Sequence, residues 1–525
     1  MTETRPVEPA LSHSAPTEPA APRVDAPFWT ASILASATGG KWSGKVPDGQ
    51  LALSGVCIDS RAVAMGCAFV AIRGDNHDGH EFAARAAEAG AAVVITSRPV
   101  SGLGSTPVLV VEDTRRALGR LAGAYREHLA AQGTVFIAVC GSNGKTTTVR
   151  MIDAVLRAGG LCGTASQKSF NNDVGVPLTV LSARVGDQFV LCEVGTNHPG
   201  EINMLGAIVR PGIAVITSIG REHLEGFGDL AGVMREEGSI ASHLRENGTL
   251  LHAEAPALED GRTFEGLLAT YTNHFTSRCM DRAYWIRRPQ AAEIAGVGQV
   301  SRVGVQWKDL HGNIWRVPLG GEHNAANAML AVWVGQAMGL DNEVIAAGLL
   351  NVEAPAMRQQ VITAGPVTVV NDAYNANPDS MLAALAAFSQ LTPSAQRRVA
   401  IIGQMGELGA SAAAAHAEVL AAALAQPGIG AVIVVGPLFA AAAADVPPGA
   451  LLAVEPLMSA ESAERLASYI KPGDAVLVKG SRSQAMERVV DAISARFASR
   501  PGAARPAGAR PTGTTITPGK ERTAP

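Results

Sequence analysis

Residues 134–160 combine an apolar run, a glycine-rich loop and an amphipathic stretch, and they constrain the fold more than any other part of the chain. TVFIAVC at 134–140 predicts a buried strand, and GSNGKTT at 141–147 leads into a helix that we expect to end at Gly159. Glycines let backbone N–H groups approach a phosphate, a helix N-terminus adds positive potential, and a lysine can reach the outer phosphates. The longer form of this motif has glycine where the chain has Val139, but strand, lysine and helix together predict a nucleotide-binding α/β domain.

Short runs rich in Val and Ile alternate with longer helical stretches along the rest of the chain. The runs lie at 91–95, 107–111, 134–140, 188–194, 213–219, 398–402, 431–435 and 475–480. This alternation predicts parallel sheets covered by helices. The apolar region 411–445 is interrupted by Pro427 and Pro437, so we interpret it as a helix, a turn and a strand rather than a membrane span.

With 525 residues, 47% of them hydrophobic, the chain is long enough for several domains. We expect boundaries near 133 and 355, which give domains at 29–133, 134–355 and 356–499. Residues 1–28 have no basic start followed by an apolar core, so they predict a disordered leader rather than a secretory signal, and 500–525 predict a disordered tail.

The charge balance and the cysteines exclude several classes of protein. Lys plus Arg total 43 against 47 Asp plus Glu, a net charge of −4, which favours neither a nucleic-acid surface nor an anionic membrane. The six cysteines include no C-x-x-C pair, which favours a reducing cytoplasm.

Polar residues follow several of the predicted strands. Glu193 ends the run at 188–194, His223 follows the run at 213–219, and Asn324 and Asn327 share one face of a predicted helix. Taken singly, Glu193 and His223 are more typical of ordinary loop polar groups than of ligands, and Asn324 and Asn327 are as typical of caps and surface contacts as of ligands. Because ligands bind beyond the carboxyl ends of strands in open α/β sheets, a shared site is also consistent with them.

The stretch VNDAYNANPDSMLAAL, at 370–385, places small polar side chains between an apolar run and a helix. Asn377 is a predicted N-cap, and Pro378 suits the first helical position. Capping leaves Asp372, Tyr374 and Asn375 unexplained, at the end of a predicted strand where a site is expected.

These motifs together resemble the Mur ligase family. The G-x-x-G-K-T loop, EVGTN, HLEGFG, GEHNAANA and Arg358 after APAM resemble its ATP-site landmarks, and CIDSRAVAMG, from residue 57, resembles its UDP-binding domain. DAYNANPDSM, with SFNNDVGVPLTVL, is similar to the members that add D-alanyl-D-alanine. The resemblance implies an α/β fold of three domains: a UDP-substrate domain, a central P-loop ATPase with a mostly parallel sheet, and a C-terminal Rossmann-like domain.

The implied reaction joins D-alanyl-D-alanine to UDP-MurNAc-tripeptide in peptidoglycan synthesis. A carboxylate resists attack by an amine, so ATP first converts it into an acyl phosphate; the dipeptide amine then displaces phosphate, giving UDP-MurNAc-pentapeptide, ADP and phosphate. The resemblance implies ATP and Mg²⁺ as cofactors and a cytoplasmic enzyme. We also expect a monomer without membrane insertion.

The resemblance also implies roles for individual residues. The implied catalytic residues are Lys145, Glu193, His223 and Arg358, and the implied Mg²⁺ ligands are Thr146, Glu193, His223 and Glu237. ATP would contact Gly141, Ser142, Asn143, Gly144, Lys145, Thr146, Thr147, Asn324, Asn327, Arg358 and Asp372. The other substrates would contact Asp59, Ser60, Arg61, Asn171, Asn172, Tyr374, Asn375 and Asn377. Lys479 and Arg482 are further candidate cations, although a lysine after a strand is more often solvated.

Glu237 marks a departure from the family. Mur ligases commonly carry a lysine, carbamylated by CO₂, soon after HLEGFG, whereas this chain has no lysine between 222 and 250. The alignment that we favour places Glu237 at that position, where its carboxylate could supply the negative charge directly. The alternative is a solvated helix carboxylate.

Three other functions share part of this pattern. A MurE-type ligase would add diaminopimelate or lysine to UDP-MurNAc-dipeptide, but no D-x-P-R-type motif is evident. Folylpolyglutamate synthetase would lack the domain that carries Asp59, Ser60 and Arg61. A regulatory protein built on an inactive ligase is disfavoured because the implied catalytic residues are all present.

Overall fold

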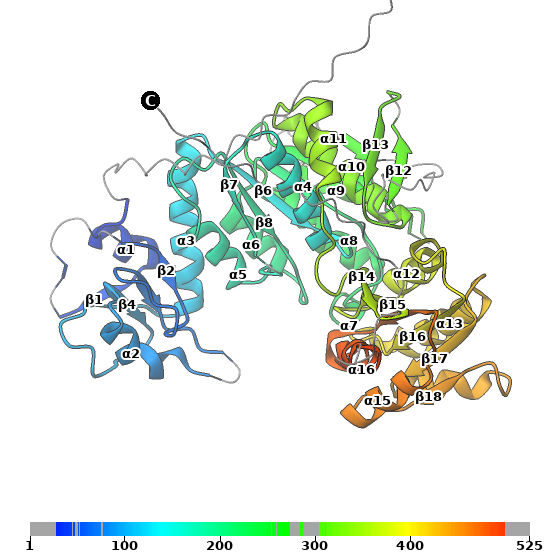
Figure 1. Ribbon diagram of the computed structural model, residues 1–525. Coiled ribbons are helices and arrows are strands. Elements are labelled where there is room, and N and C mark those ends of the chain that lie inside the picture. Colours follow the sequence, from blue (N-terminus) through cyan, green and yellow to red (C-terminus); the bar gives the residue numbers. More distant parts are fainter. Residues whose placement is uncertain are drawn as a thin grey trace, which may run out of the picture.

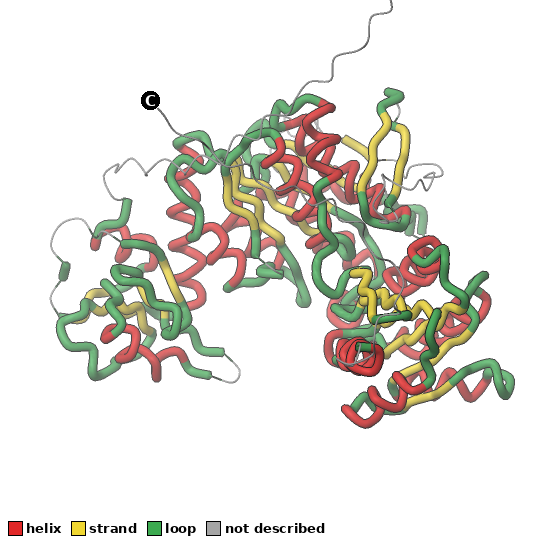
Figure 2. Tube along the Cα trace, in the orientation of Figure 1, coloured by secondary structure: helices red, strands yellow, loops and turns green. Residues whose placement is uncertain are grey.

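The computed structural model describes residues 28–498 except 45, 48–50, 52, 75–76, 168, 254, 259, 273–283, 287–303 and 310. Three large sheets follow one another along the chain, and helices cover each of them (Figure 1). Figure 2 shows the strands of the second and third sheets lying between helices. The termini predicted to be disordered lie outside the described residues, except for Phe28.

The first sheet has five strands in the order β1-β5-β4-β3-β2, and among these strands only β1 and β5 pair antiparallel. Its strands are β1 (Lys41–Ser43), β2 (Val56–Cys57), β3 (Ala68–Val70), β4 (Val93–Thr96) and β5 (Val108–Val110). Its helices are α1 (Ala31–Thr38), η1 (Gly79–Phe82), α2 (Ala83–Glu88) and α3 (Thr114–Ala131). Helix α3 packs on α1 and also on α5 (Gly175–Leu181) and α6 (Glu201–Val209), so one apolar core continues from the first sheet into the second.

The second sheet has six strands, all parallel among the described residues, in the order β11-β10-β9-β6-β8-β7. They are β6 (Val135–Cys140), β7 (Gly163–Ala165), β8 (Phe189–Glu193), β9 (Ile213–Ile216), β10 (Thr249–Ala253) and β11 (Tyr284–Ile286). The helices, besides α5 and α6, are α4 (Lys145–Ala158), α7 (Leu224–Phe227), α8 (Leu230–Gly238), η2 (Ser239–His243), α9 (Phe264–Thr272), α10 (Glu322–Ala337) and α11 (Asn342–Leu350). A hairpin of β12 (Val305–Lys308) and β13 (Ile314–Val317) precedes α10.

The register of the second sheet positions the site. Ala138 of β6 lies opposite Cys192 of β8 and Ala214 of β9. The loops that follow these three strands therefore meet at one edge of the sheet.

The third sheet has the order β14-β15-β19-β16-β17-β18, in which only β14 pairs antiparallel among the described strands. They are β14 (Gln360–Ala364), β15 (Val367–Asp372), β16 (Arg397–Gly403), β17 (Ala431–Val435), β18 (Ala453–Glu455) and β19 (Asp474–Lys479). The helices are α12 (Pro378–Leu391), η4 (Gly409–Ser411), α13 (Ala412–Ala425), α14 (Pro437–Ala442), η5 (Ala443–Asp445), α15 (Ala460–Ser468), η6 (Arg482–Gln484) and α16 (Glu487–Phe497). Separate apolar cores around Phe388 and Ile493 show that helices bury both faces of the sheet.

The predicted fold class is confirmed, since all eight Val/Ile-rich runs contain strands and nearly all pairings are parallel. The region 411–445 forms α13 and β17 as predicted. No helix in the described part of the chain has the length and apolarity needed to span a bilayer. The domain boundaries at 133 and 355 stay predictions.

Candidate active site

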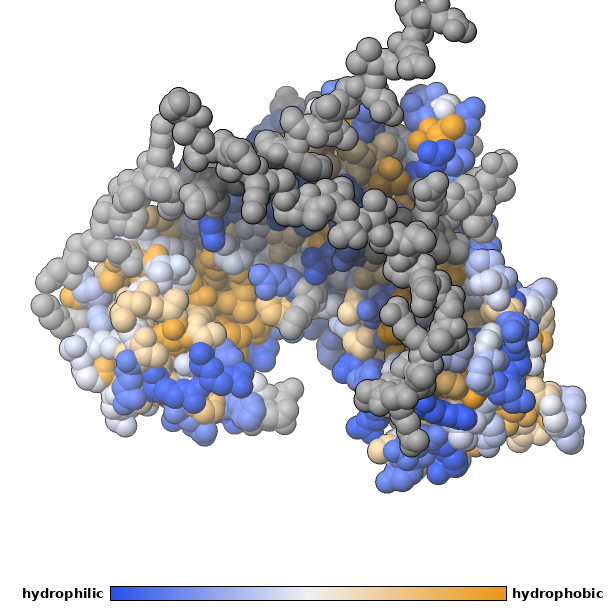
Figure 3. Space-filling model, in the orientation of Figure 1, coloured by the Kyte–Doolittle hydropathy of each residue, from blue (hydrophilic) through white to orange (hydrophobic). Residues whose placement is uncertain are grey.

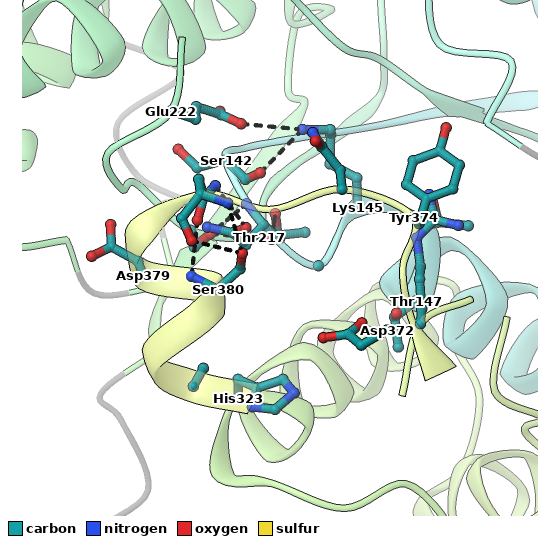
Figure 4. Close-up of a pocket in the computed structure, with 18 of the residues that line it drawn as sticks. Ser142, Lys145, Thr147, Thr217, Glu222, His323, Asp372, Tyr374, Asp379 and Ser380 are labelled. Carbon is teal, nitrogen blue, oxygen red and sulfur yellow. Dashed lines mark hydrogen bonds and ion pairs between the residues drawn. The ribbon is translucent and has the colours of Figure 1, made fainter. Parts of the chain in front are cut away.

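A cleft of about 1610 Å³ lies between the carboxyl edge of the second sheet and the part of the chain that forms the third sheet (Figure 4). Its walls include the phosphate loop, the segment between β9 and α7, the start of α10, and the segment from β15 into α12. A pocket for one small molecule commonly measures roughly 300–1,000 Å³, so this cleft has room for more than one substrate.

The phosphate loop has a backbone shape that favours glycine. Gly141 has a φ of +115° and Gly144 one of +89°. A Cβ would lie 2.5 Å from Thr217 Oγ1 at Gly141, and 2.5 Å from Asn327 Oδ1 at Gly144. A side chain at either position would be both strained and crowded. The loop therefore forms a cradle that only bare backbone fits, as a phosphate site requires.

The first half of the loop is anchored and the second half is available for a ligand. The Gly141 amide donates to Glu237 Oε2 (2.8 Å), and the next two amides donate to Ser218 O (2.8 Å) and Ser218 Oγ (2.9 Å). Gly144 is the N-cap of α4 and residues 145–147 begin the helix, and the first N–H groups of a helix have no partner within it. Among the predicted nucleotide ligands, these four therefore present the amides that best suit phosphate oxygens.

Lys145 is nearly buried and surrounded by oxygen atoms. Its Nζ donates to Gly141 O (2.5 Å) and Ser142 O (3.4 Å), and it lies 3.9 Å from Glu222 Oε2. Burial favours the neutral amine, but the carboxylates of Glu222, Glu237 and Glu193 outweigh it and raise the pKa of Lys145. The ammonium is therefore charged and directed at the loop.

Thr146 and Glu193 form a buried pair of oxygen donors. The Thr146 hydroxyl donates to Glu193 Oε2 (2.7 Å), and Asn171 Nδ2 donates to Glu193 Oε1 (3.1 Å). Burial raises the pKa of Glu193, and these hydrogen bonds and the cations of Lys145 and Arg358 oppose that shift. No three His, Cys, Asp or Glu side chains among the described residues could hold a metal by themselves. A hydroxyl and a carboxylate at the edge of a phosphate loop nevertheless suit Mg²⁺, which keeps water and phosphate oxygens as its other ligands.

His223, a predicted metal ligand, lines the cleft but contacts the third part of the chain. Its Nδ1 forms a short hydrogen bond with Glu407 Oε2, and its Nε2 lies 3.8 Å from Glu222 Oε2. Glu222 was not predicted. Its side chain is only 7% exposed, it lines the cleft, and its Oε1 has no hydrogen-bond partner among the described residues.

Asp372 and Lys479 form a buried ion pair at the end of β15. Lys479 Nζ lies 2.9 Å from Asp372 Oδ2 and donates to Asn375 O (3.0 Å), while Asp372 Oδ1 accepts from the Gln359 amide (3.1 Å). Lys479 is thus not solvated, and it holds the loop on which Asn375 exposes its side chain. Arg482 lines the cleft, is 57% exposed and pairs with Glu487.

Arg358 and Tyr374 stack on each other, and both line the cleft. The Arg358 guanidinium carbon lies 3.7 Å from the centre of the Tyr374 ring, and Arg358 Nη2 donates to Ser169 Oγ (2.9 Å). A stacked guanidinium is held in one plane while its N–H groups remain able to bind an anion.

Asn377 has two contacts with different consequences. Its Oδ1 accepts from the Ser380 amide (2.8 Å), which confirms the predicted N-cap and forms a capping box. Its Nδ2 donates to Asn143 Oδ1 in the phosphate loop (3.0 Å). The N-terminus of α12 therefore faces the loop.

Asn324 and Asn327 are buried side by side in the first turns of α10. Asn327 Nδ2 donates to Asn324 Oδ1 (3.3 Å), and Asn324 Nδ2 donates to Gly320 O (2.7 Å). Both line the cleft, with Asn327 against Gly144.

Arg221 joins the second and third parts of the chain, a role that the sequence did not reveal. Its guanidinium donates to Asp379 Oδ1 (2.8 and 3.0 Å) and to both Glu418 oxygens (2.7 and 3.2 Å). The Arg221 amide also donates to Asp379 Oδ2 (2.7 Å). The pairing with Glu418 and Asp379 raises the pKa of Arg221 despite partial burial.

Glu237 lies behind the phosphate loop and is fully buried. One of its oxygens, Oε2, accepts a hydrogen bond from the Gly141 amide. The other oxygen, Oε1, has no hydrogen-bond partner among the described residues. Burial raises the pKa of Glu237 to about 8, Lys145 opposes that rise, and Glu222 adds to it. The alternative of a solvated helix carboxylate is excluded by this burial, whereas the predicted role as a metal ligand stays a prediction.

Asp59, Ser60 and Arg61 are not brought to the cleft. They lie in the first part of the chain, at the left of Figure 1, where Arg61 pairs with Asp59 (2.7 Å) and Ser60 Oγ accepts from Arg85 (2.6 Å). The Arg61 side chain is 79% exposed. Figure 3 shows that the molecule is hollowed between its first and third parts.

The loop before α5 links the first part to the cleft. Asp173 lines the cleft and pairs with Arg115 of α3 (2.8 Å), which also donates to Arg73 O (3.3 Å). Asn172 Oδ1 accepts a hydrogen bond from the Gly175 amide (2.9 Å) at the start of α5, and this bond fixes the loop.

Comparison with family models identifies Mur ligase domains along the chain. The Mur ligase family catalytic domain matches residues 52–126, the Mur ligase middle domain 139–335, and the Mur ligase glutamate ligase domain 357–482.

Curated relatives and solved structures agree. The chain is 34% identical over 460 residues to the UDP-N-acetylmuramoyl-tripeptide–D-alanyl-D-alanine ligase of Escherichia coli, covering 86% of this chain and 96% of that one. The ligase of the same name from Bacillus subtilis is 34% identical, over 69% of this chain and 75% of that one. The crystal structure of MurF from Acinetobacter baumannii superposes with a TM-score of 0.76 at 30% identity, covering 89% and 98% of the two chains.

Replacing Arg221 with Ala should loosen the contact between the second and third parts of the chain. Ion pairs of this partly exposed kind contribute about 1 kcal/mol, roughly a fivefold shift between joined and separated arrangements. Small-angle X-ray scattering of the ligand-free protein should give a larger radius of gyration for R221A. Arg116→Ala, at an exposed position on α3, is the matched control, and equal radii for R221A and the native chain would contradict the role of Arg221.

Replacing Glu237 with Gln should change how stability depends on pH. Because folding raises the pKa of Glu237 from its ordinary value of 4.5 to about 8, its favourable contribution to stability is complete below pH 4.5 and is lost as pH rises through 8. The neutral amide avoids this loss, so the stability advantage of E237Q should grow from pH 5 to pH 9, on the order of a few kcal/mol. Thermal unfolding over that range measures it. Glu343→Gln, exposed on α11, should show no such trend, and parallel curves for E237Q and the native chain would refute the prediction.

Proposed function

The chain belongs to the Mur ligase family, and on this premise we propose that its cleft joins D-alanyl-D-alanine to UDP-N-acetylmuramoyl-tripeptide at the expense of ATP. The chain is an ATP-dependent amide ligase of peptidoglycan synthesis, and its product is UDP-MurNAc-pentapeptide. A single observation supports this location most: one cleft is lined both by the phosphate loop and by the polar segment Asp372–Asn377.

In the first step, the phosphate loop positions ATP so that the peptide carboxylate is phosphorylated. The amides at the start of α4 and the Lys145 ammonium bind the terminal phosphates of ATP and balance the charge that moves as a phosphoryl group passes to the carboxylate. Arg358, held flat on Tyr374, supplies a second cation from across the cleft. Asp372 binds the ribose, and Asn324 and Asn327 bind near the base.

The second step forms the amide bond. The dipeptide amine attacks the acyl phosphate carbon, the C–N bond forms, the C–O bond to phosphate breaks, and the amine loses a proton. Tyr374, Asn375 and Asn377 shape the entry for the dipeptide beside the loop. Asn377 links this entry to the phosphate site through Asn143, and closure of the third domain keeps water from the acyl phosphate.

The long substrate spans the first and second domains. Arg61 binds the diphosphate of UDP beside Asp59 and Ser60, and an exposed guanidinium suits that anion. The peptide then extends past Asn172 and Asn171 to the phosphate loop. This path is supported by the position of both asparagines in the wall of the cleft.

Thr146 and Glu193 would hold Mg²⁺, since their oxygens are buried at the loop and suit a hard cation. When bound, Mg²⁺ neutralises phosphate charge. His223 would contribute a ring nitrogen, and Glu237, where it is ionised, would supply negative charge from behind the loop rather than from the cleft.

The alternative MurE-type reaction receives no support from the relatives, whose names specify D-alanyl-D-alanine. We further propose a cytoplasmic monomer with domains at 29–133, 134–355 and 356–499, in agreement with the span of each sheet.

Acceptor-resolved phosphate release tests the reaction. Purified protein with ATP should release phosphate only when UDP-MurNAc-tripeptide and D-Ala-D-Ala are both present. Lys145→Ala should reduce turnover by at least about a hundredfold, because one electrostatic contact in phosphoryl transfer is removed. Turnover with UDP-MurNAc-dipeptide and free diaminopimelate or lysine would indicate the MurE-type reaction instead, and full activity of K145A would refute the site.

The proposed charge of Glu237 has its own test. Glu237→Gln keeps an oxygen for the Gly141 amide but cannot ionise, so above pH 8, where Glu237 is charged, half-maximal turnover should need severalfold more Mg²⁺. Titration of Mg²⁺ against phosphate release measures this, with Glu343→Gln as the control. An unchanged Mg²⁺ requirement in E237Q would show that Glu237 does not replace the missing lysine.

A further inference from the structure

Cys57 and Cys67 form a pair of thiols in the first sheet, away from the cleft. Their Sγ atoms lie 2.9 Å apart. Both thiols are free in this structure. They flank the turn that carries Asp59, Ser60 and Arg61, and neither takes part in the proposed reaction.

The strand pairing explains why the two sulfurs meet. Cys57 ends β2 and lies opposite Phe69 of the parallel strand β3, and Cys67 is two residues before Phe69. Since side chains alternate along a strand, Cys57, Phe69 and Cys67 project from the same face, with the two cysteines as diagonal neighbours. Gly66, whose amide donates to Gly90 O (2.8 Å), returns the chain into β3 and fixes this approach.

The pair differs from the other cysteines of the described chain. Cys140 and Cys192 are fully buried in β6 and β8, and burial raises the pKa of both thiols. Cys162 is exposed. Cys57 is partly exposed beside Cys67, so a small oxidant in solvent can reach a thiol that already has its partner in contact.

The protonation of the pair favours reaction. The contact with Cys57 lowers the pKa of Cys67 to about 7, although burial opposes that shift. The pKa of Cys57 is raised by the same contact. One thiolate beside one thiol is the combination from which a disulfide forms.

We propose that Cys57 and Cys67 are an oxidative modification site at which a peroxide closes a reversible disulfide. The sulfur–sulfur bond forms as both S–H bonds and the peroxide O–O bond break. The two thiols lose two electrons and two protons, and hydrogen peroxide is reduced to two molecules of water. A dithiol reductant reverses the reaction by thiol–disulfide exchange.

The disulfide would close a ring around the turn that carries the proposed diphosphate contacts, and this consequence rests on the proposed function. In the present structure Arg61 donates to both oxygens of Asp59, at 2.7 to 3.1 Å. The Arg61 side chain is exposed and its Nη1 makes none of these bonds, so it can meet a diphosphate, and a bridge across the ends of the turn would restrict how the turn adjusts to that ligand. Oxidation should therefore raise the KM for the UDP-linked substrate severalfold and leave the KM for the dipeptide unchanged.

The chemical part of the proposal can be tested without any assay of activity. The full-length protein, reduced and then treated with a small excess of hydrogen peroxide, should lose the mass of two hydrogens, and dithiothreitol should restore it. Peptide mapping should find a Cys57–Cys67 link. Cys162→Ser is the matched control and should form the link, whereas Cys57→Ser and Cys67→Ser should not.

Two results would overturn the modification site: no link in the native protein, or a link from either residue to Cys279, which lies outside the described residues. If the mapped link forms but the KM for the UDP-linked substrate is unchanged in oxidised C162S, the effect on the diphosphate turn is wrong. Failure of the proposed function would appear separately, as absence of dipeptide-dependent phosphate release in the fully reduced protein.

Discussion

The proposed phosphate loop after β6 must offer bare backbone while remaining rigid, and the contacts around it follow from that constraint. Its glycines exclude side chains because Thr217 and Asn327 occupy the space that a Cβ would need. Its first amides are fixed from behind by Glu237 and from the side by Ser218, so they cannot adjust to a ligand. The amides that begin α4 remain, and the helix dipole adds to their attraction for an anion. Rigidity and ligand binding are thus divided between the two halves of one short loop.

The third domain completes the site because its own local structure faces this loop. Asn377 caps α12 with one side-chain atom and reaches Asn143 with the other, so the residue that begins the helix also fixes its position over the phosphate site. Arg221 reinforces the same contact through Asp379, in the first turn of α12. Because Asn377 both caps α12 and contacts the loop of the second domain, the capping pattern in the sequence reveals only the first of its two roles.

Local patterns predicted the elements, whereas the sequence could not reveal contacts between distant segments. The strand, loop and helix at 134–160 and the cap at Asn377 follow from residues a few positions apart, and the structure has them. Arg221 pairs with Asp379 and Glu418, which lie 158 and 197 residues away in the sequence. A periodic pattern within one segment cannot predict a contact between segments so far apart. The sequence leaves Lys479 either as a cationic contact or as a solvated side chain, and only the structure shows that an ion pair with Asp372 compensates its burial. The direction of Glu237 likewise depends on how α8 packs behind the loop, which a helical position alone does not specify.

The charges around Lys145 favour a cation beside the proposed nucleotide site. Three carboxylates, those of Glu193, Glu222 and Glu237, are buried near one ammonium, and two of them have an oxygen without a hydrogen-bond partner among the described residues. Burying an ionised carboxylate is costly unless an opposite charge is nearby; one lysine does not balance all three, and burial accordingly raises the pKa of Glu193 and Glu237. The anionic phosphates of ATP alone would add to the imbalance. A divalent cation beside Thr146 and Glu193 would satisfy both the carboxylates and the phosphates, since it is the largest local charge such a site can hold. The excess of buried acid over base therefore favours nucleotide and metal entering together, with each lowering the electrostatic cost of the other.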